Sequence, residues 1–140
     1  MRPNRFRKNK YNAQKTIYFE GQLIALDDAT EEQKRDGKLF HSWGEADRYA
    51  TLIADKSISG VLCQVPFEIR VGDAVVCAYI ADFVYTSNTG RQIVEDVKGV
   101  RTELFAIKKK LMEAVHGIYI REVKPRRKPA AKRKKEKPSG

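Results

Sequence analysis

Hydrophobic and polar positions alternate with the period of a β-strand through much of the second half of the chain. The alternation is clearest in residues 79–98, where two alternating runs flank the turn-forming residues 87–90, SNTG. Side chains of successive residues in a strand point to opposite faces of the sheet. The pattern therefore predicts a β-hairpin with a short loop.

The register of this hairpin decides which polar side chains meet. If Thr86 faces Gln92 across the turn, the same register places Asp82 opposite Asp96. Lys98 follows Asp96 by two residues and so shares its face. The hairpin is therefore expected to gather two carboxylates and one ammonium group.

This group of charges has two interpretations. Two close carboxylates repel each other unless a cation lies between them, and a hard divalent cation with oxygen ligands suits that position. A neighbouring lysine can orient or deprotonate a water, or balance developing negative charge, so the set suits metal-assisted phosphodiester hydrolysis. The alternative is a solvent-facing hairpin with an ordinary cross-strand Asp/Lys pair.

The remaining patterns predict a mixed α/β chain. After residue 40 the expected order is α-β-β-β-α-β, and residues 22–39 look like an excursion from the core. The expected segments are strand 16–20, a short polar helix at 28–36, helix 43–55, strand 64–71, strand 74–85, a helix from about 103 to 116 and strand 118–123.

The two longer expected helices each have an apolar side that should be buried. Ser42 and Glu45 have the spacing of a capping box, and Glu45 also heads the apolar face of its helix. Its carboxylate is therefore either a capping group or a group aimed at the hairpin site. In the later helix the expected buried side carries Leu104, Ile107, Leu111 and Val115.

Positive charge is concentrated at the two ends of the chain. The net charge is +10, of which residues 1–15 carry +6 and residues 124–140 carry +8, which leaves −4 for residues 16–123. We expect a basic N-terminal arm, a folded domain over 16–123 and a disordered basic tail over 124–140. Such arms bind polyanions through counterion release, although a solubilising tail has the same composition.

Other classes of protein are disfavoured. No apolar run approaches the length of a membrane span, so we expect no membrane partner. Two cysteines and two histidines show no metal-ligand spacing, which argues against a zinc site.

Several strings together resemble a small family of phage and prophage proteins described as a domain of unknown function. That family is similar to a branch of the PD-(D/E)xK, or restriction-endonuclease-like, nuclease superfamily. The resemblance covers roughly residues 10–123. It rests on Ser42, Glu45-Ala46, Arg48-Tyr49, Gln64-Val65-Pro66-Phe67, Tyr79-Ile80-Ala81-Asp82-Phe83, Val94-Glu95-Asp96-Val97-Lys98-Gly99, Thr102 and Lys108-Lys109-Lys110-Leu111.

The resemblance implies a fold and a set of site residues. The fold would be a restriction-endonuclease-like αβββαβ core. Asp82 and Asp96 would bind metal with the helix-borne acid Glu45, and the backbone carbonyl of Val97 would complete the coordination. Lys98 would be the catalytic lysine. Gln64 stands where many members place a strand glutamine near the metal.

The expected activity is endonucleolytic cleavage of DNA with Mg²⁺ or Mn²⁺. No recognition helix is visible, so we expect recognition of backbone and shape, as in branched, junction or nicked DNA. A Holliday junction resolvase of phage recombination would act as a homodimer in the host cytoplasm. The expected DNA-binding residues are Arg101, Thr102, Lys108, Lys109, Lys110, Arg126, Arg127 and Lys128. The alternative is a non-catalytic DNA- or RNA-binding module with basic tails.

Overall fold

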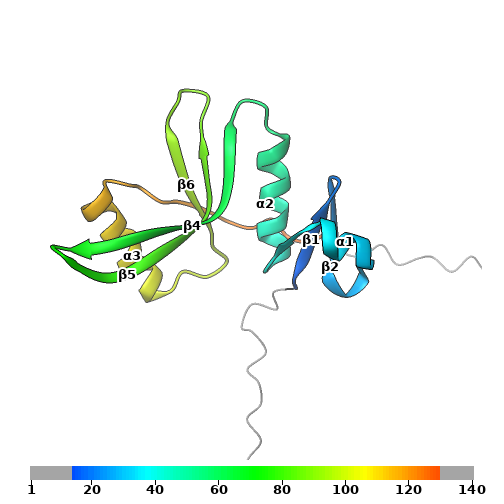
Figure 1. The fold of residues 1–140 in the computed structure, drawn as a ribbon, viewed down its shortest axis with the longest axis horizontal. Coiled ribbons are helices and arrows are strands. Elements are labelled where there is room, and N and C mark those ends of the chain that lie inside the picture. The colour runs from blue at the N-terminus through cyan, green and yellow to red at the C-terminus, as the bar shows by residue number, and fades with distance from the viewer. Residues whose placement is uncertain (1–13, 130–140) are drawn as a thin grey trace, which may run out of the picture.

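The computed structural model describes residues 14–129, which form an α+β fold with two sheets (Figure 1). The helices of this region are α1 (Glu31–Asp36), α2 (Trp43–Ala54) and α3 (Glu103–His116), with a 3₁₀ turn at Leu26–Asp28. None of them is long and apolar enough to cross a membrane. The strands are β1 (Thr16–Phe19), β2 (Gln22–Ala25), β3 (Lys38–Phe40), β4 (Ser59–Val71), β5 (Ala74–Thr86), β6 (Gln92–Val97) and β7 (Arg121–Val123).

The larger sheet has the strand order β4-β5-β6-β7. Its first three strands are antiparallel neighbours, and β7 lies parallel to β6 after the crossover through α3. The order α-β-β-β-α-β predicted after residue 40 is therefore confirmed. Residues 22–39 form β2, α1 and β3, and the two strands pair with β1 in a separate three-stranded sheet.

The register predicted for the central hairpin is confirmed. Thr86 pairs with Gln92, and the same register continues to the pair Phe83 and Glu95. Gly90 closes the turn with a φ of 82°, a left-handed conformation that glycine adopts without a steric cost. The turn and the alternation together set the register, because a slip of one residue would move every side chain of β6 to the opposite face of the sheet.

Two hydrophobic clusters cover opposite faces of the larger sheet. Val94 belongs to the cluster that contains Phe105 and Met112 of α3. Its neighbour Ile93 packs against the cluster that contains Leu52 of α2. Because neighbouring residues of a strand face opposite sides, α3 and α2 lie on opposite faces of the sheet. The central strands are therefore covered on both sides.

The ribbon formed by β4 and β5 bends part-way along its length (Figure 1). Gln64 has a φ of 53°, a left-handed conformation that is uncommon in a non-glycine residue. On β5, Phe83 belongs to the cluster beneath α2, whereas Ala81 belongs to the cluster beneath α3. Residues two apart in a regular strand face the same side of the sheet, so the ribbon must rotate between Ala81 and Phe83, at Asp82. The bend places Asp82 where the two halves of the ribbon meet.

Two sequence-based expectations about the core are wrong. Strand β4 begins at Ser59 rather than at residue 64. Gly60 has a left-handed backbone with a φ of 65°, and the strand accommodates it in an irregularity of the β4–β5 register between Ser59 and Leu62. The buried face of α3 carries Phe105 and Met112. Of the face expected to be buried, Leu111 packs against the core, whereas Leu104, Ile107 and Val115 are 61%, 56% and 41% exposed.

Residues 124–129, expected to belong to a disordered tail, lie against the start of α2. A Cβ on Gly44 would meet Pro125 Cβ at 2.6 Å, so this contact requires glycine. Arg126 donates two hydrogen bonds of 2.8 and 2.7 Å to the carboxylate of Asp47. The structure therefore shows an anchored segment, which we call the C-terminal strap (residues 124–129). Both arms beyond residues 14 and 129 lie outside the described residues.

Helix α2 is joined to β6 by a buried ion pair. Glu95 is fully buried, and its two carboxylate oxygens accept hydrogen bonds of 2.8 and 2.7 Å from Arg48. The hydroxyl of Tyr85 also donates to this carboxylate, and Arg121 lies 3.8 Å away. A buried carboxylate is tolerated only when its charge and lone pairs have partners.

We expect Arg48→Ala to destabilise the protein by roughly 3–5 kcal/mol, because it leaves a buried charge without its main partner. The matched control is Arg121→Ala, which removes an exposed and more distant arginine and should cost less than about 1 kcal/mol. Urea unfolding followed by circular dichroism measures both changes. Equal losses for the two variants would contradict the assigned importance of Arg48.

Candidate metal and nucleic-acid site

Asp82 lies at the bend of β5 and contacts both neighbouring strands. Its Oδ2 accepts a hydrogen bond of 2.8 Å from the backbone N–H of Val97 on β6. Its Oδ1 accepts a longer one, of 3.3 Å, from the side-chain amide of Gln64 on β4. The predicted proximity of Gln64 to the acidic site is therefore present, and the bend at Gln64 is part of it.

Asp96 is the most buried of the candidate ligands. It is 3% exposed, and its Oδ2 accepts a hydrogen bond of 2.7 Å from the hydroxyl of Tyr79. Its Oδ1 lies 3.2 Å from Lys98 Nζ, yet no donor among residues 14–129 is directed at it in hydrogen-bonding geometry. One buried carboxylate oxygen is thus available to a further cation.

Lys98 is held between a carboxylate and an aromatic ring. Besides its ion pair with Asp96, its Nζ lies 4.5 Å from the centre of the Phe105 ring. An ammonium over an aromatic face is attracted by the ring quadrupole. The side chain remains 30% exposed, so the ammonium is fixed in place while still open to solvent.

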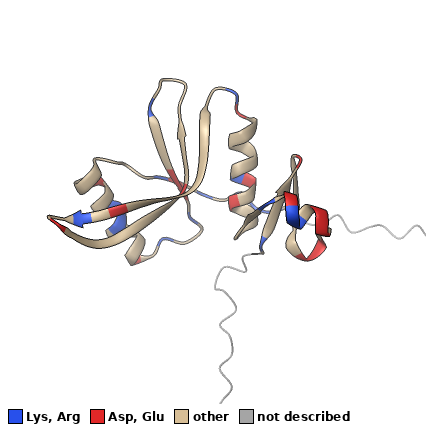
Figure 2. Cartoon of the chain, in the orientation of Figure 1, with Lys and Arg blue, Asp and Glu red and all other residues tan. Residues whose placement is uncertain are grey.

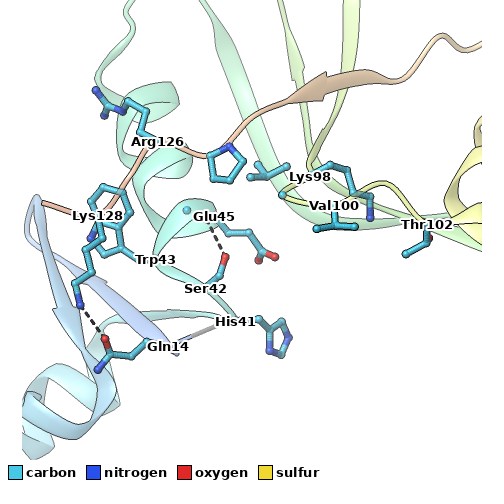
Figure 3. Close-up of a pocket in the computed structure, with 14 residues that line it drawn as sticks. Gln14, His41, Ser42, Trp43, Glu45, Lys98, Val100, Thr102, Arg126 and Lys128 are labelled. Atoms are coloured by element: carbon cyan, nitrogen blue, oxygen red, sulfur yellow. Dashed lines mark hydrogen bonds between the residues drawn. The ribbon is translucent and has the colours of Figure 1, made fainter. Parts of the chain in front are cut away.

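Glu45 approaches the same group from helix α2. Ser42 Oγ accepts the N–H of Glu45 at 3.2 Å, so Ser42 is the N-cap as predicted. The Glu45 carboxylate points away from Ser42, toward the side of the cleft that holds Lys98 (Figure 3). Burial, followed by the negative charges of Asp82 and Asp96, raises the pKa of Glu45 to about 7. Helix α2 thus has the Ser42 cap without a reciprocal bond from Glu45, and the Glu45 carboxylate lies within the influence of Asp82 and Asp96.

The three acids influence one another although they come from three elements. Burial, followed by the charge of Asp96, raises the pKa of Asp82 to about 6. The hydrogen bonds from Val97 and Gln64 oppose this rise. Burial and the Asp96 carboxylate raise the pKa of Tyr79 well above its ordinary value, so its hydroxyl keeps its proton and remains a donor. Lys98 opposes the rise of both carboxyl pKa values, so the pattern is that of buried carboxylates whose repulsion one ammonium only partly offsets.

The site opens into a cleft of about 510 Å³ between the starts of α2 and α3 and the C-terminal strap (Figure 3). Glu45, Val97 and Lys98 line it together with the aromatic side chain of Trp43. In this view Trp43 and Lys128 lie on one side of Glu45, and Lys98 and Thr102 on the other. In the orientation of Figure 2, an acidic stretch lies near the middle of the larger sheet, where its strands overlap.

The donor chemistry of the site suits a hard cation, whereas its present spacing does not form a ligand shell. Within residues 14–129, no group of three or more His, Cys, Asp or Glu side chains is arranged to hold a metal ion. Carboxylates that repel one another stay apart until a cation draws them together. The features that fit such a cation are the Asp96 Oδ1, which has an ion pair with Lys98 but no hydrogen bond, and the raised pKa values of Glu45 and Asp82.

The residues expected to bind nucleic acid fall into two groups. Six have a contact within the protein: Arg101 and Lys109 with Glu122, Thr102 as the N-cap of α3, Lys108 with the Ala78 carbonyl, Arg126 with Asp47, and Lys128 with Gln14. The other two, Lys110 and Arg127, are exposed. Lys128 donates a hydrogen bond of 2.8 Å to the neutral side chain of Gln14, so its charge stays uncompensated there.

Sequence reasoning missed three supporting groups. Tyr79 positions Asp96, Arg48 pairs with Glu95, and Asp47 anchors the strap. Tyr79 lies three residues before Asp82, but in an unbent strand its side chain would face away from that aspartate. Only the bend of the ribbon brings it to the acidic face.

A family model described as a protein of unknown function (DUF1064) matches residues 8–126, most of the 140-residue chain. The protein belongs to this family. No curated protein and no solved structure gives a significant match. The DUF1064 region includes every candidate ligand from Glu45 to Lys98 and the strap residue Arg126. The DUF1064 description names no activity, so any function must be argued from the site.

The raised pKa values predict a pH-dependent stability. Between about pH 4 and pH 7 the folded protein holds protons on Glu45 and Asp82 that the unfolded chain releases, so their contribution to stability falls as pH rises. The stability of Asp82→Asn relative to wild type should therefore be higher at pH 8 than at pH 5. Urea unfolding at both pH values, without divalent metal, measures this difference.

The control for this experiment is Asp73→Asn, at an exposed position in the β4–β5 turn. Its stability relative to wild type should not change between the two pH values. A constant difference for Asp82→Asn would show that the carboxylates are not crowded.

Proposed function

We propose that this protein is a divalent-metal-dependent endonuclease that hydrolyses phosphodiester bonds in DNA. The observation that carries the proposal is that the charges of Asp82 on β5 and Asp96 on β6 act on Glu45 of α2, while Lys98 pairs with Asp96. Glu45 and Lys98 line the cleft. Perturbed carboxyl pKa values in a cleft are typical of functional sites. Purely structural acids are usually paired, as Glu95 is with Arg48.

Each residue of the site would have a separate role in the reaction. Asp82, Asp96 and Glu45 would hold Mg²⁺ or Mn²⁺, with the Val97 carbonyl as the further expected ligand. The bound ion would lower the pKa of its water and offset charge on the phosphate. Tyr79 holds the Asp96 carboxylate in place, and Phe105 and Asp96 hold Lys98. Lys98 would orient the attacking water or balance negative charge on the phosphate.

The proposal extends to the wider relationship and to the substrate. The α-β-β-β-α-β order and the spacing of the site residues support a relationship with PD-(D/E)xK nucleases of phage and prophage genomes. The acidic body needs the basic arms to attract phosphates, and such contacts do not read sequence. Branched, junction or nicked DNA in the cytoplasm, cut by a homodimer, fits these features.

A second candidate is a non-catalytic DNA-binding module. The observation that favours it is that no three carboxylates among residues 14–129 are arranged to hold a metal. Such a module would bind DNA through its basic residues without any dependence on divalent ions. Labelled junction, flap, nicked and plain duplex DNA incubated with and without Mg²⁺ separates the two candidates.

We expect Asp82→Asn to lose metal affinity and cleavage together, because it removes charge from the ligand set. Lys98→Ala should keep metal binding while cleavage slows by roughly 10²-fold or more, because its ammonium acts on the chemical step. Calorimetric Mg²⁺ titration and cleavage of labelled DNA measure the two properties separately.

Matched controls are the exposed residues Asp73 and Lys56, changed to Asn and Ala, which should behave as wild type. Full cleavage by Asp82→Asn would rule out the nuclease site. Near wild-type cleavage by Lys98→Ala would remove the lysine from the mechanism.

A further inference from the structure

Trp43 is a large aromatic side chain without a place in the core. It is the only tryptophan of the chain, it is the first residue of α2, and it lines the cleft. It belongs to neither hydrophobic cluster and stacks on no other aromatic ring among residues 14–129. Side chains of this size normally bury 150–250 Å² in a core or an interface. Half-buried in a cleft wall, Trp43 has a face available for a ligand.

The charged residues that line the cleft are three basic ones, Lys98, Arg126 and Lys128, and one acidic one, Glu45, so the balance favours an anion. Lys128 lies on the same side of the cleft as Trp43, and among residues 14–129 it is bound by the neutral amide of Gln14 (Figure 3). Arg126, by contrast, is neutralised by Asp47. The first turns of α2 and α3, at residues 42–45 and 102, both border the cleft, and the positive ends of helix dipoles favour phosphates. An aromatic face flanked by positive charge is the arrangement that binds single-stranded nucleic acids.

The dimensions of the cleft favour a single strand of nucleic acid over a double strand. A volume of about 510 Å³ lies in the range of pockets that enclose one small molecule, roughly 300–1,000 Å³. The strap bounds the cleft on one side, through Pro125 against Gly44 and Lys128 against Gln14. The bases of an intact duplex stay stacked within the duplex. Only an unpaired base can therefore reach an aromatic ring in a cleft.

We infer that this cleft binds single-stranded DNA, with one unpaired base stacked on Trp43 and the adjacent phosphates at Lys128 and the start of α2. The inference rests on the proposed function for the choice of DNA as the ligand. In that function, the unpaired stretch of DNA lies beside the phosphate that is cut. Trp43 is then the residue that selects DNA with an unpaired segment, such as a flap or a junction centre.

The single tryptophan gives a direct optical test on the full-length protein. An oligothymidylate of about 12 nucleotides is titrated into wild-type protein in Ca²⁺ without Mg²⁺. Stacking of a base on the indole should quench the tryptophan fluorescence in proportion to binding. A blunt duplex of the same length should bind without this quenching. Binding of the oligothymidylate without any change in fluorescence would overturn the inference.

Variants test the energetic contribution of the ring. Trp43→Ala should weaken binding of labelled oligothymidylate roughly 5- to 140-fold, measured by anisotropy, while duplex affinity changes less than twofold. Trp43→Phe keeps an aromatic face and should recover most of the affinity. The control is Tyr119→Ala, a 73% exposed aromatic outside the cleft. Equal losses for single strand and duplex, or no loss, would refute the role of Trp43.

The outcomes separate this inference from the proposed function. Fluorescence quenching without any Mg²⁺- or Mn²⁺-dependent cleavage would refute the nuclease and leave a single-strand binding site. Metal-dependent cleavage without any change in Trp43 fluorescence would support the nuclease and refute the single-strand binding site. Tighter binding of an oligouridylate than of the oligothymidylate would overturn the choice of DNA. Unchanged circular dichroism and thermal unfolding of Trp43→Phe guard against a loss of fold.

Discussion

The ion pair between Arg48 and Glu95 determines where helix α2 lies on the larger sheet. Glu95 precedes Asp96 on β6 and faces the opposite side of the sheet, and Arg48 follows Glu45 by three residues on α2. The pair therefore fixes both elements that carry acids to the cleft. Because burial of the carboxylate is costly without its partner, the pair favours one position of the helix over neighbouring positions. The placement of Glu45 near Asp82 depends on this contact.

The candidate site collects several features that cost stability. Glu45 and Asp82 have raised pKa values, one oxygen of buried Asp96 lacks a hydrogen bond, and Gln64 has a left-handed backbone. Departures of this kind cluster where function requires them. A divalent cation, as proposed, would relieve the repulsion and satisfy the free oxygen. The left-handed backbone of Gln64 belongs to the bend that brings Tyr79 and Asp82 to the same acidic group.

The sequence predicted the local features of the fold and missed those that depend on distant residues. The hairpin register followed from alternation and a turn, which involve only neighbouring residues. The face of α3 was misjudged because two apolar faces compete, and packing on the sheet selected Phe105 and Met112. The contact of Arg48 with Glu95 spans 47 residues and has no local signal. The bend at Gln64 was likewise invisible, since glutamine has no preference for a left-handed backbone.

The hydrogen bond between Gln14 and Lys128 joins the two ends of the described chain beside the cleft. Five basic residues precede Gln14 and five follow Pro129 in the sequence, so both sets are attached at one place on the protein surface. A segment tethered next to a binding site acts at a local concentration that reaches the millimolar range for short flexible linkers. If the proposed DNA binding holds and either end contacts a DNA backbone, the cleft would meet nearby DNA as an intramolecular partner, and weak affinity of the cleft itself would suffice for occupancy.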